Sequence, residues 1–175
     1  MIIKAIIAAI ITLAILGTTS QIIWPPIPRL LYNPSSSAAI GWYHLRPNEI
    51  PNRDDKVAAF APPWARTLAD ERGYLPSDYP LIKTVWAVAG EHVCYNNQSV
   101  SVPKRPDIPV LGQDVLGRDM PQQSGCHVLK QGEYLLISPD VQTGFDSRYF
   151  GPVGKENIIG VVQYIGDNRG LKRNE

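Results

Sequence analysis

The chain has 175 residues, a length that suits one domain with a hydrophobic core and a short appendage. Its formal net charge is +1, and its Lys and Arg residues are scattered rather than gathered in a stripe, which excludes the basic face that nucleic acids require. Its 16 prolines and 14 glycines, with few helical periodicities, predict a mainly β fold with many turns.

The chain begins with an apolar run over residues 5–23 that carries no charged side chain. Its length matches a helix across a bilayer, and Trp24 stands where an interfacial aromatic residue is common. A cleavable signal peptide is the alternative, because residues 17–20 resemble a cleavage site, but the apolar run continues past them. We therefore predict a transmembrane anchor over residues 1–24 and an extracytoplasmic domain over residues 25–175.

A cluster of three serines follows a proline-rich connector over residues 25–34. A serine hydroxyl held just outside a bilayer can act as a nucleophile, although serines after a proline more often form a linker. The cluster, Ser35, Ser36 and Ser37, is therefore a candidate site whose interpretation depends on the rest of the chain.

Short strands separated by turn residues are expected over most of the remaining chain. A helix is predicted over residues 64–72, between Pro62-Pro63 and Gly73, and its polar character places it on the surface. Strands are predicted over residues 40–45, 56–61, 81–88, 134–138 and 158–165, and a hairpin over 91–102 in which Asn96-Asn97 takes positive φ values. Long irregular segments are expected over residues 103–125 and 143–153, and a loose tail over 167–175.

Cys94 and Cys126 are the two cysteines of the chain, and both lie beyond the apolar run. An even number of thiols suits one disulfide in an oxidising compartment, and two buried free thiols are the alternative. The three histidines show no metal-ligand spacing with these cysteines, so neither a metal site nor a cofactor is expected.

Lys83 lies inside the apolar strand 81–88, where a lysine either extends its amine to water or is buried. Burial lowers the pKa of the amine, which can then act as a base near neutral pH. A neutral lysine activates a serine without a histidine, and the sequence holds no nucleophile-elbow pattern that would favour a Ser–His–Asp triad. A pair of one serine and Lys83 therefore fits the residues better.

Three stretches of the chain resemble the signature boxes of type I signal peptidases, and more closely those of the TraF branch that matures conjugative pilins. The TraF pattern around the nucleophile is Asn-x-Ser-x-Ser-x-Pro-x-Gly-x-Tyr. Its positions fall on Asn33, Ser35, Ser37, Gly41 and Tyr43, with Ala39 in place of the proline. Residues 81–93 are similar to the lysine box, and residues 144–153, with the earlier Gly125-Cys126, also match.

The resemblance implies a signal-peptidase-like β domain in which Ser37 is the nucleophile and Lys83 the general base. By position, the Ser35 hydroxyl assists the oxyanion hole together with the backbone N–H of Ser37. Asp146 is implied as a supporting residue that holds Arg148 or the lysine strand, and a turn-forming Asp–Arg pair without a catalytic part is the alternative.

The chain departs from the resemblance at Gly144, two residues before Asp146. Signal peptidases often carry a serine there that orients the lysine. Either Thr143 or Asp146 is therefore expected to take over this task.

The implied protein is a membrane-anchored serine endopeptidase, a single-pass protein of the bacterial inner membrane with its catalytic domain in the periplasm. Its expected partners are a membrane-associated pilin precursor as substrate, inner-membrane lipid, and a conjugative secretion apparatus, with no nucleic acid. The acyl-enzyme is released by water, or by the substrate's own amino terminus to give a cyclic pilin. The alternatives are a general type I signal peptidase and a non-catalytic bitopic component of a secretion apparatus.

Overall fold

The computed structural model describes residues 2–23 and 29–167. Trp24, the connector up to residue 28 and the tail from residue 168 lie outside the described residues, together with the expectations placed on them. Helix α1, Ile2–Ile23, contains a stretch from Ile2 to Thr19 with a mean hydropathy of 2.2 and no buried residue. Its length and composition make it a candidate membrane anchor.

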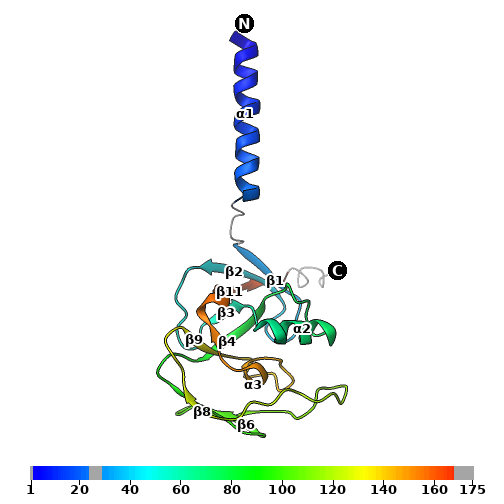
Figure 1. The fold of residues 1–175 in the computed structure, drawn as a ribbon, viewed down its shortest axis with the longest axis vertical. Coiled ribbons are helices and arrows are strands. Elements are labelled where there is room, and N and C mark those ends of the chain that lie inside the picture. The colour runs from blue at the N-terminus through cyan, green and yellow to red at the C-terminus, as the bar shows by residue number, and fades with distance from the viewer. Residues whose placement is uncertain (1, 24–28, 168–175) are drawn as a thin grey trace, which may run out of the picture.

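Two antiparallel sheets form the body of the described chain after α1, with few helices, which confirms the mainly β prediction (Figure 1). The larger sheet has the strand order β1-β2-β11-β3-β4-β9-β10, and the smaller has the order β7-β6-β5-β8. The larger sheet consists of β1 (Leu30–Asn33), β2 (Gly41–Pro47), β3 (Lys56–Ala59), β4 (Leu81–Ala87), β9 (Glu133–Ile137), β10 (Val153–Gly154) and β11 (Ile158–Gly166). The smaller consists of β5 (His92–Tyr95), β6 (Ser99–Ser101), β7 (Ile108–Pro109) and β8 (Gly125–Val128).

The larger sheet has apolar side chains on both of its faces, because successive residues of a strand point to opposite sides. In β3, Val57 and Ala59 belong to the larger core cluster, whereas Ala58 between them belongs to a smaller one. Tyr43 and Ile82 extend this smaller cluster onto β2 and β4. The central strands are therefore covered on two sides, which keeps the side chains that they carry away from bulk water.

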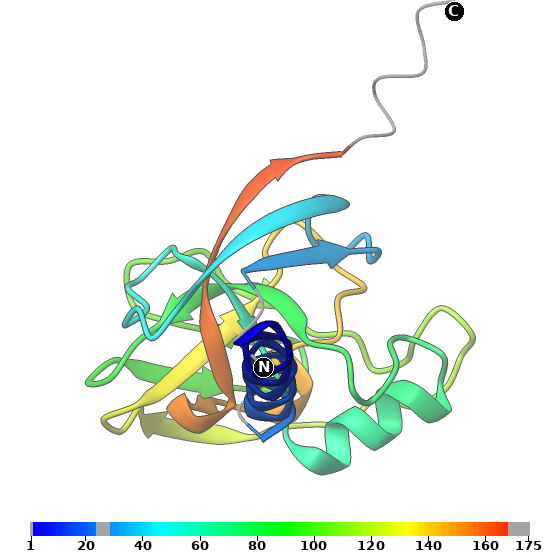
Figure 2. The ribbon, with the colours of Figure 1, turned by 90° about the horizontal axis from the view of Figure 1, so that it is seen from above.

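Helix α2, Pro63–Glu71, confirms the predicted helix to within one residue at each end. It begins at a proline, whose missing N–H costs nothing in the first turn, and is followed by Gly73 with a φ of +69°. Viewed along α1, it lies at the periphery of the β domain (Figure 2). The helix is more than a polar surface insertion, since Ala65 and Ala69 are buried in the larger core.

Several irregular segments are more ordered than the sequence predicted. Leu30–Asn33, assigned to the connector, is strand β1 because it pairs with β2. The segment 103–125 contains strand β7 and an isolated bridge between Gln113 and Asp119. The segment 143–153 contains the short helix α3, Ser147–Phe150, and a 3₁₀ helix follows over Lys155–Asn157.

The connection between β5 and β6 differs from the predicted Asn96-Asn97 turn, because neither asparagine has a positive φ. Instead, the side-chain oxygen of Asn96 accepts hydrogen bonds from the backbone N–H groups of Gln98 and Ser99, both at 2.8 Å. An asparagine side chain that mimics a backbone turn in this way removes the need for left-handed residues.

Cys94 and Cys126 form a disulfide, as predicted. The two residues face each other on β5 and β8, so the bond links two neighbouring strands of the smaller sheet. The alternative of two free thiols is therefore wrong.

Candidate active site

The serine cluster lies in the short connection, residues 34–40, between β1 and β2. Asn33, whose side chain is almost fully buried, accepts a hydrogen bond from the backbone N–H of Ser35 at 3.1 Å. Its amide nitrogen donates to the carbonyls of Ser35 and Ala39 at 2.8 and 3.1 Å. The Tyr43 hydroxyl donates to the same Ala39 carbonyl at 2.8 Å. The conformation of this connection, which we call the serine loop, is thus fixed from inside the domain.

Within the serine loop, Ser35 and Ser37 contact each other. The Ser35 hydroxyl donates to the Ser37 hydroxyl at 3.1 Å, and the backbone N–H of Ser37 donates to the Ser35 hydroxyl at 3.2 Å. These are the two groups expected to donate to an oxyanion, and here they bond to each other. A carbonyl oxygen entering the site would replace these contacts.

Lys83 lies in β4 with only 2% of its surface exposed. The pKa of its amine is lowered to about 8, chiefly by burial. The Asp146 carboxylate opposes this shift, and the charges of Arg148 and Lys56 add to it. The sequence left open whether the Lys83 amine reaches water or is buried, and in the structure it is buried. A large fraction of this amine is neutral at a pH where an exposed lysine is fully protonated.

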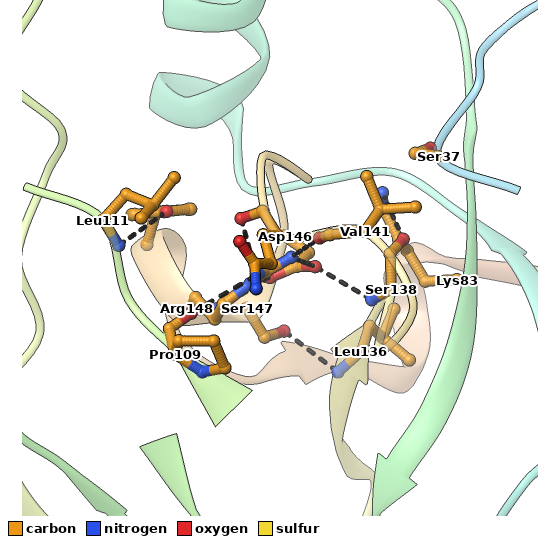
Figure 3. Close-up of polar contacts among 12 residues, drawn as sticks. Ser37, Lys83, Pro109, Leu111, Leu136, Ser138, Val141, Asp146, Ser147 and Arg148 are labelled. Carbon is orange, nitrogen blue, oxygen red and sulfur yellow. Dashed lines mark hydrogen bonds and ion pairs between the residues drawn. The ribbon is translucent and has the colours of Figure 1, made fainter. Parts of the chain in front are cut away.

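The Lys83 amine donates a hydrogen bond to the hydroxyl of Ser138 at 2.9 Å (Figure 3). Ser138 is buried and directly follows β9, the strand that pairs with β4. Thr143 or Asp146 was expected to orient this amine. Within residues 2–23 and 29–167 neither of them forms a hydrogen bond with it, and Ser138 does. The sequence analysis missed Ser138, although a polar residue ending the apolar strand 134–138 was a usable signal.

Asp146 is fully buried and caps the first turn of α3. Its carboxylate accepts hydrogen bonds from Nε and Nη2 of Arg148, both at 2.8 Å, and from the Arg148 backbone N–H at 3.1 Å. It also accepts one from the backbone N–H of Ser138 at 2.9 Å. Asp146 therefore holds Arg148 and, through Ser138, the segment that contacts Lys83.

Two clefts of about 220 and 390 Å³ share the side chains of Ser37 and Lys83. The first cleft has a mainly apolar wall that includes Leu111, Met120 and Phe145. In the described part of the chain, the Ser37 hydroxyl and the Lys83 amine form no hydrogen bond with each other. Figure 3 shows Ser37 on the serine loop beside the Lys83–Ser138 pair. A peptide in these clefts would therefore meet a hydroxyl and a weakly basic amine.

A mainly β domain after an apolar helix, in which the serine loop and a buried lysine line the same clefts, is the arrangement that the sequence predicted for a signal-peptidase-like protein. The family model described as signal peptidase, peptidase S26, matches residues 2–166. The chain therefore belongs to the S26 peptidase family.

The curated relatives include transfer proteins and a signal peptidase. The plasmid transfer protein TraF of Escherichia coli is 33% identical over 144 residues, which cover 76% of this chain and 80% of that protein. The probable conjugal transfer protein TraF of Sinorhizobium fredii is 30% identical over 168 residues, covering 90% and 86%. Signal peptidase I V of Bacillus subtilis is 30% identical over 97 residues, covering 50% and 58%. The resemblance to TraF proteins is thus confirmed.

Proposed function

We propose that this chain is a membrane-anchored serine endopeptidase in which Ser37 is the nucleophile and Lys83 the general base. The observation that carries the proposal is the buried Lys83 amine, with its pKa lowered to about 8, which lines the same clefts as the Ser37 hydroxyl. Serine becomes nucleophilic when a nearby base takes its proton, and a neutral lysine amine meets that requirement.

In the proposed reaction, the Ser37 oxygen attacks the scissile carbonyl and its proton passes to the Lys83 amine. The resulting ammonium then protonates the departing amine, and the acyl group remains on Ser37 as an ester. The Ser35 hydroxyl and the Ser37 N–H turn from each other to the carbonyl oxygen as it becomes negative. Water releases the acyl group to complete cleavage, or the amino terminus of the same substrate releases it as a cyclic product.

We propose a pilin precursor as the substrate, processed for conjugative pilus assembly. The support is that two of the relatives carry the names of plasmid and conjugal transfer proteins. Residues 1–24 are proposed as a single-pass anchor in the inner membrane and residues 25–175 as a periplasmic peptidase domain. The apolar helix α1 and the disulfide Cys94–Cys126 favour this placement.

Co-expression with the candidate pilin precursor, followed by the intact mass of the pilin recovered from membranes, tests this proposal. The wild-type chain and Ser36→Ala, which alters the exposed serine next to the nucleophile, are expected to yield a truncated pilin. Ser37→Ala is expected to leave the precursor whole. A product lighter than the linear fragment by one water indicates cyclisation. An unchanged precursor mass with all three chains rejects this substrate.

A general signal peptidase is the second candidate, favoured by the similarity to signal peptidase I V of Bacillus subtilis. The two functions differ in the range of substrates. A panel of unrelated exported precursors separates them, since a pilin-specific enzyme leaves the panel uncleaved and a general signal peptidase processes most of it.

A further inference from the structure

Ser138 lies where three parts of the site meet. Its hydroxyl accepts the hydrogen bond from the Lys83 amine at 2.9 Å, and its backbone N–H donates to the Asp146 carboxylate at 2.9 Å. The Lys83 and Ser138 side chains are almost fully buried, at 2% and 4% exposure. A single residue thus connects the proposed base to a buried ion pair.

The frame behind Ser138 is rigid because the guanidinium of Arg148 is bonded on several sides. Besides the Asp146 carboxylate, it donates to the carbonyls of Val141 at 2.8 Å and Gln142 at 2.9 Å. Arg148 is 1% exposed, and its guanidinium would lose these hydrogen bonds if the side chain moved. The Ser138 backbone, held by the same carboxylate, keeps its hydroxyl in a fixed place.

Gly144 allows this arrangement by having no side chain. A Cβ atom at this position would lie 2.8 Å from Nη2 of Arg148, 3.1 Å from the Val141 carbonyl oxygen and 3.3 Å from the Cβ of Ser138. Nη2 is the end of a long side chain, but it donates to Val141 and to Asp146, so a Cβ atom at residue 144 would push it out of these bonds. A hydroxyl carried by residue 144 is therefore incompatible with the observed positions of Arg148 and Ser138.

We propose that Ser138 is the positioning residue of Lys83, and that Gly144 is required as glycine so that Ser138 and Arg148 can occupy their places. The inference rests on the proposed function, because it assigns the orientation of the proposed base. By accepting one hydrogen of the amine, the Ser138 hydroxyl fixes the direction of the nitrogen lone pair, which must face Ser37 to take its proton.

The charged groups around Lys83 are known, so an effect of Ser138 on its titration can be separated from theirs. Lys56 faces it from β3, and Asp146 and Arg148 face it from the start of α3. Asp140 lines the second cleft with it. None of these is altered when Ser138 loses its hydroxyl. An accepted hydrogen bond favours the ammonium over the neutral amine, so its loss should move the Lys83 titration to lower pH.

The test compares Ser138→Ala with Ser124→Ala, which removes an exposed hydroxyl from a residue that lines neither of the two clefts. With the full chain in detergent and the pilin precursor as substrate, Ser138→Ala is expected to lower kcat on the order of 100-fold, the effect of misplacing a reacting group. KM should stay unchanged and the midpoint of the pH–rate profile should move to lower pH. Ser124→Ala should match the wild type, and Ser138→Thr, which keeps a hydroxyl, should recover part of kcat.

A second readout does not depend on a substrate. In a chain with isotope-labelled lysine, the Lys83 resonance followed against pH is expected to titrate at lower pH in Ser138→Ala than in the wild type. An unchanged titration, or a kcat in Ser138→Ala equal to that of the wild type, overturns the inference. If Ser37→Ala is inactive while Ser138→Ala is fully active, the inference fails alone. If Ser37→Ala is active, the proposed function fails.

Discussion

Lys83 is an amine placed where its ammonium form is costly. Burial in β4 lowers its pKa to about 8, and the nearby Asp146 carboxylate only partly offsets this. The sequence showed a lysine in an apolar strand but left open whether its amine reaches water. That choice depends on residues distant in the sequence that lie near the amine, namely Ser138 after β9 and the buried pair of Asp146 and Arg148.

The proposed role of Lys83 sets the pH dependence of cleavage. Because only the neutral amine accepts the Ser37 proton, the rate is expected to rise about tenfold per pH unit below a midpoint near 8 and to level off above it. Lys83→Arg should be inactive throughout, since a guanidinium keeps its proton. The measurement is the initial cleavage rate between about pH 6 and about pH 10, the range in which a lysine base titrates. A flat profile argues against Lys83 as the base.

Ser138 shows what sequence patterns leave out at this scale. Its hydroxyl contacts the Lys83 amine only because β9 pairs with β4 and because Gly144 leaves room for Arg148. The first condition is a pairing between strands that are far apart in the sequence. The second is the room that a missing side chain leaves for its neighbour. From the sequence, the partner of the lysine was therefore expected at Thr143, which is exposed, or at Asp146, and not at Ser138.

At the scale of elements, the serine loop owes its position to the strands on either side of it. Asn33, at the end of β1, is hydrogen-bonded to the loop through both the nitrogen and the oxygen of its side-chain amide. The sequence pattern picked out Asn33 and Ser37 together, but it placed the asparagine in a connector. β1 was missed because a strand of four residues is defined by its pairing with β2 more than by its own composition.

Asn33→Ala is expected to weaken both the loop and the fold. The change leaves the Ser35 N–H and the Ser35 carbonyl without their partner, whereas the Ala39 carbonyl keeps its bond from Tyr43. The expected cost is about 1–3 kcal/mol in the free energy of unfolding. The cleavage rate should fall on the order of 100-fold because the nucleophile is displaced. Thermal unfolding and initial rates measure the two effects.

The matched control for Asn33→Ala is Asn97→Ala, at an exposed asparagine in the β5–β6 connection. Its unfolding midpoint and cleavage rate should equal those of the wild type. If Asn33→Ala behaves like this control, the loop is held by other contacts and the assigned role of Asn33 is wrong.

For the whole molecule, composition predicted the class of fold but not its topology. The abundance of proline and glycine indicated short strands, and most of the predicted strands are present. The last strand, β11, lies between β2 and β3, and β9 lies beside β4. These long-range pairings bring residues 37, 83 and 138 together, and no local periodicity encodes them.

A buried lysine should also reduce the stability of the whole domain. The folded-state pKa of about 8 lies below the value of about 10.4 for an exposed lysine, so the cost is fully present below pH 8. It is lost as the pH rises toward the unfolded-state pKa, because the unfolded chain then binds more protons than the folded one.

Lys83→Met is therefore expected to be inactive yet more stable than the wild type at neutral pH, by on the order of a few kcal/mol. The gain should shrink as the pH approaches about 10. Denaturant unfolding of the two chains at neutral and alkaline pH measures this difference. A variant that is less stable than the wild type at neutral pH contradicts the burial cost assigned to Lys83.

The proposed reaction transfers a peptide acyl group to the oxygen of Ser37, and trapping the resulting ester is the decisive test. The purified full chain is mixed with the pilin precursor, quenched in acid, and digested for mass analysis of the peptide that contains Ser37. An acyl adduct on Ser37 is expected in the wild type and in Ser36→Ala, and neither adduct nor cleavage in Ser37→Ala. Cleavage at the wild-type rate by Ser37→Ala would contradict it.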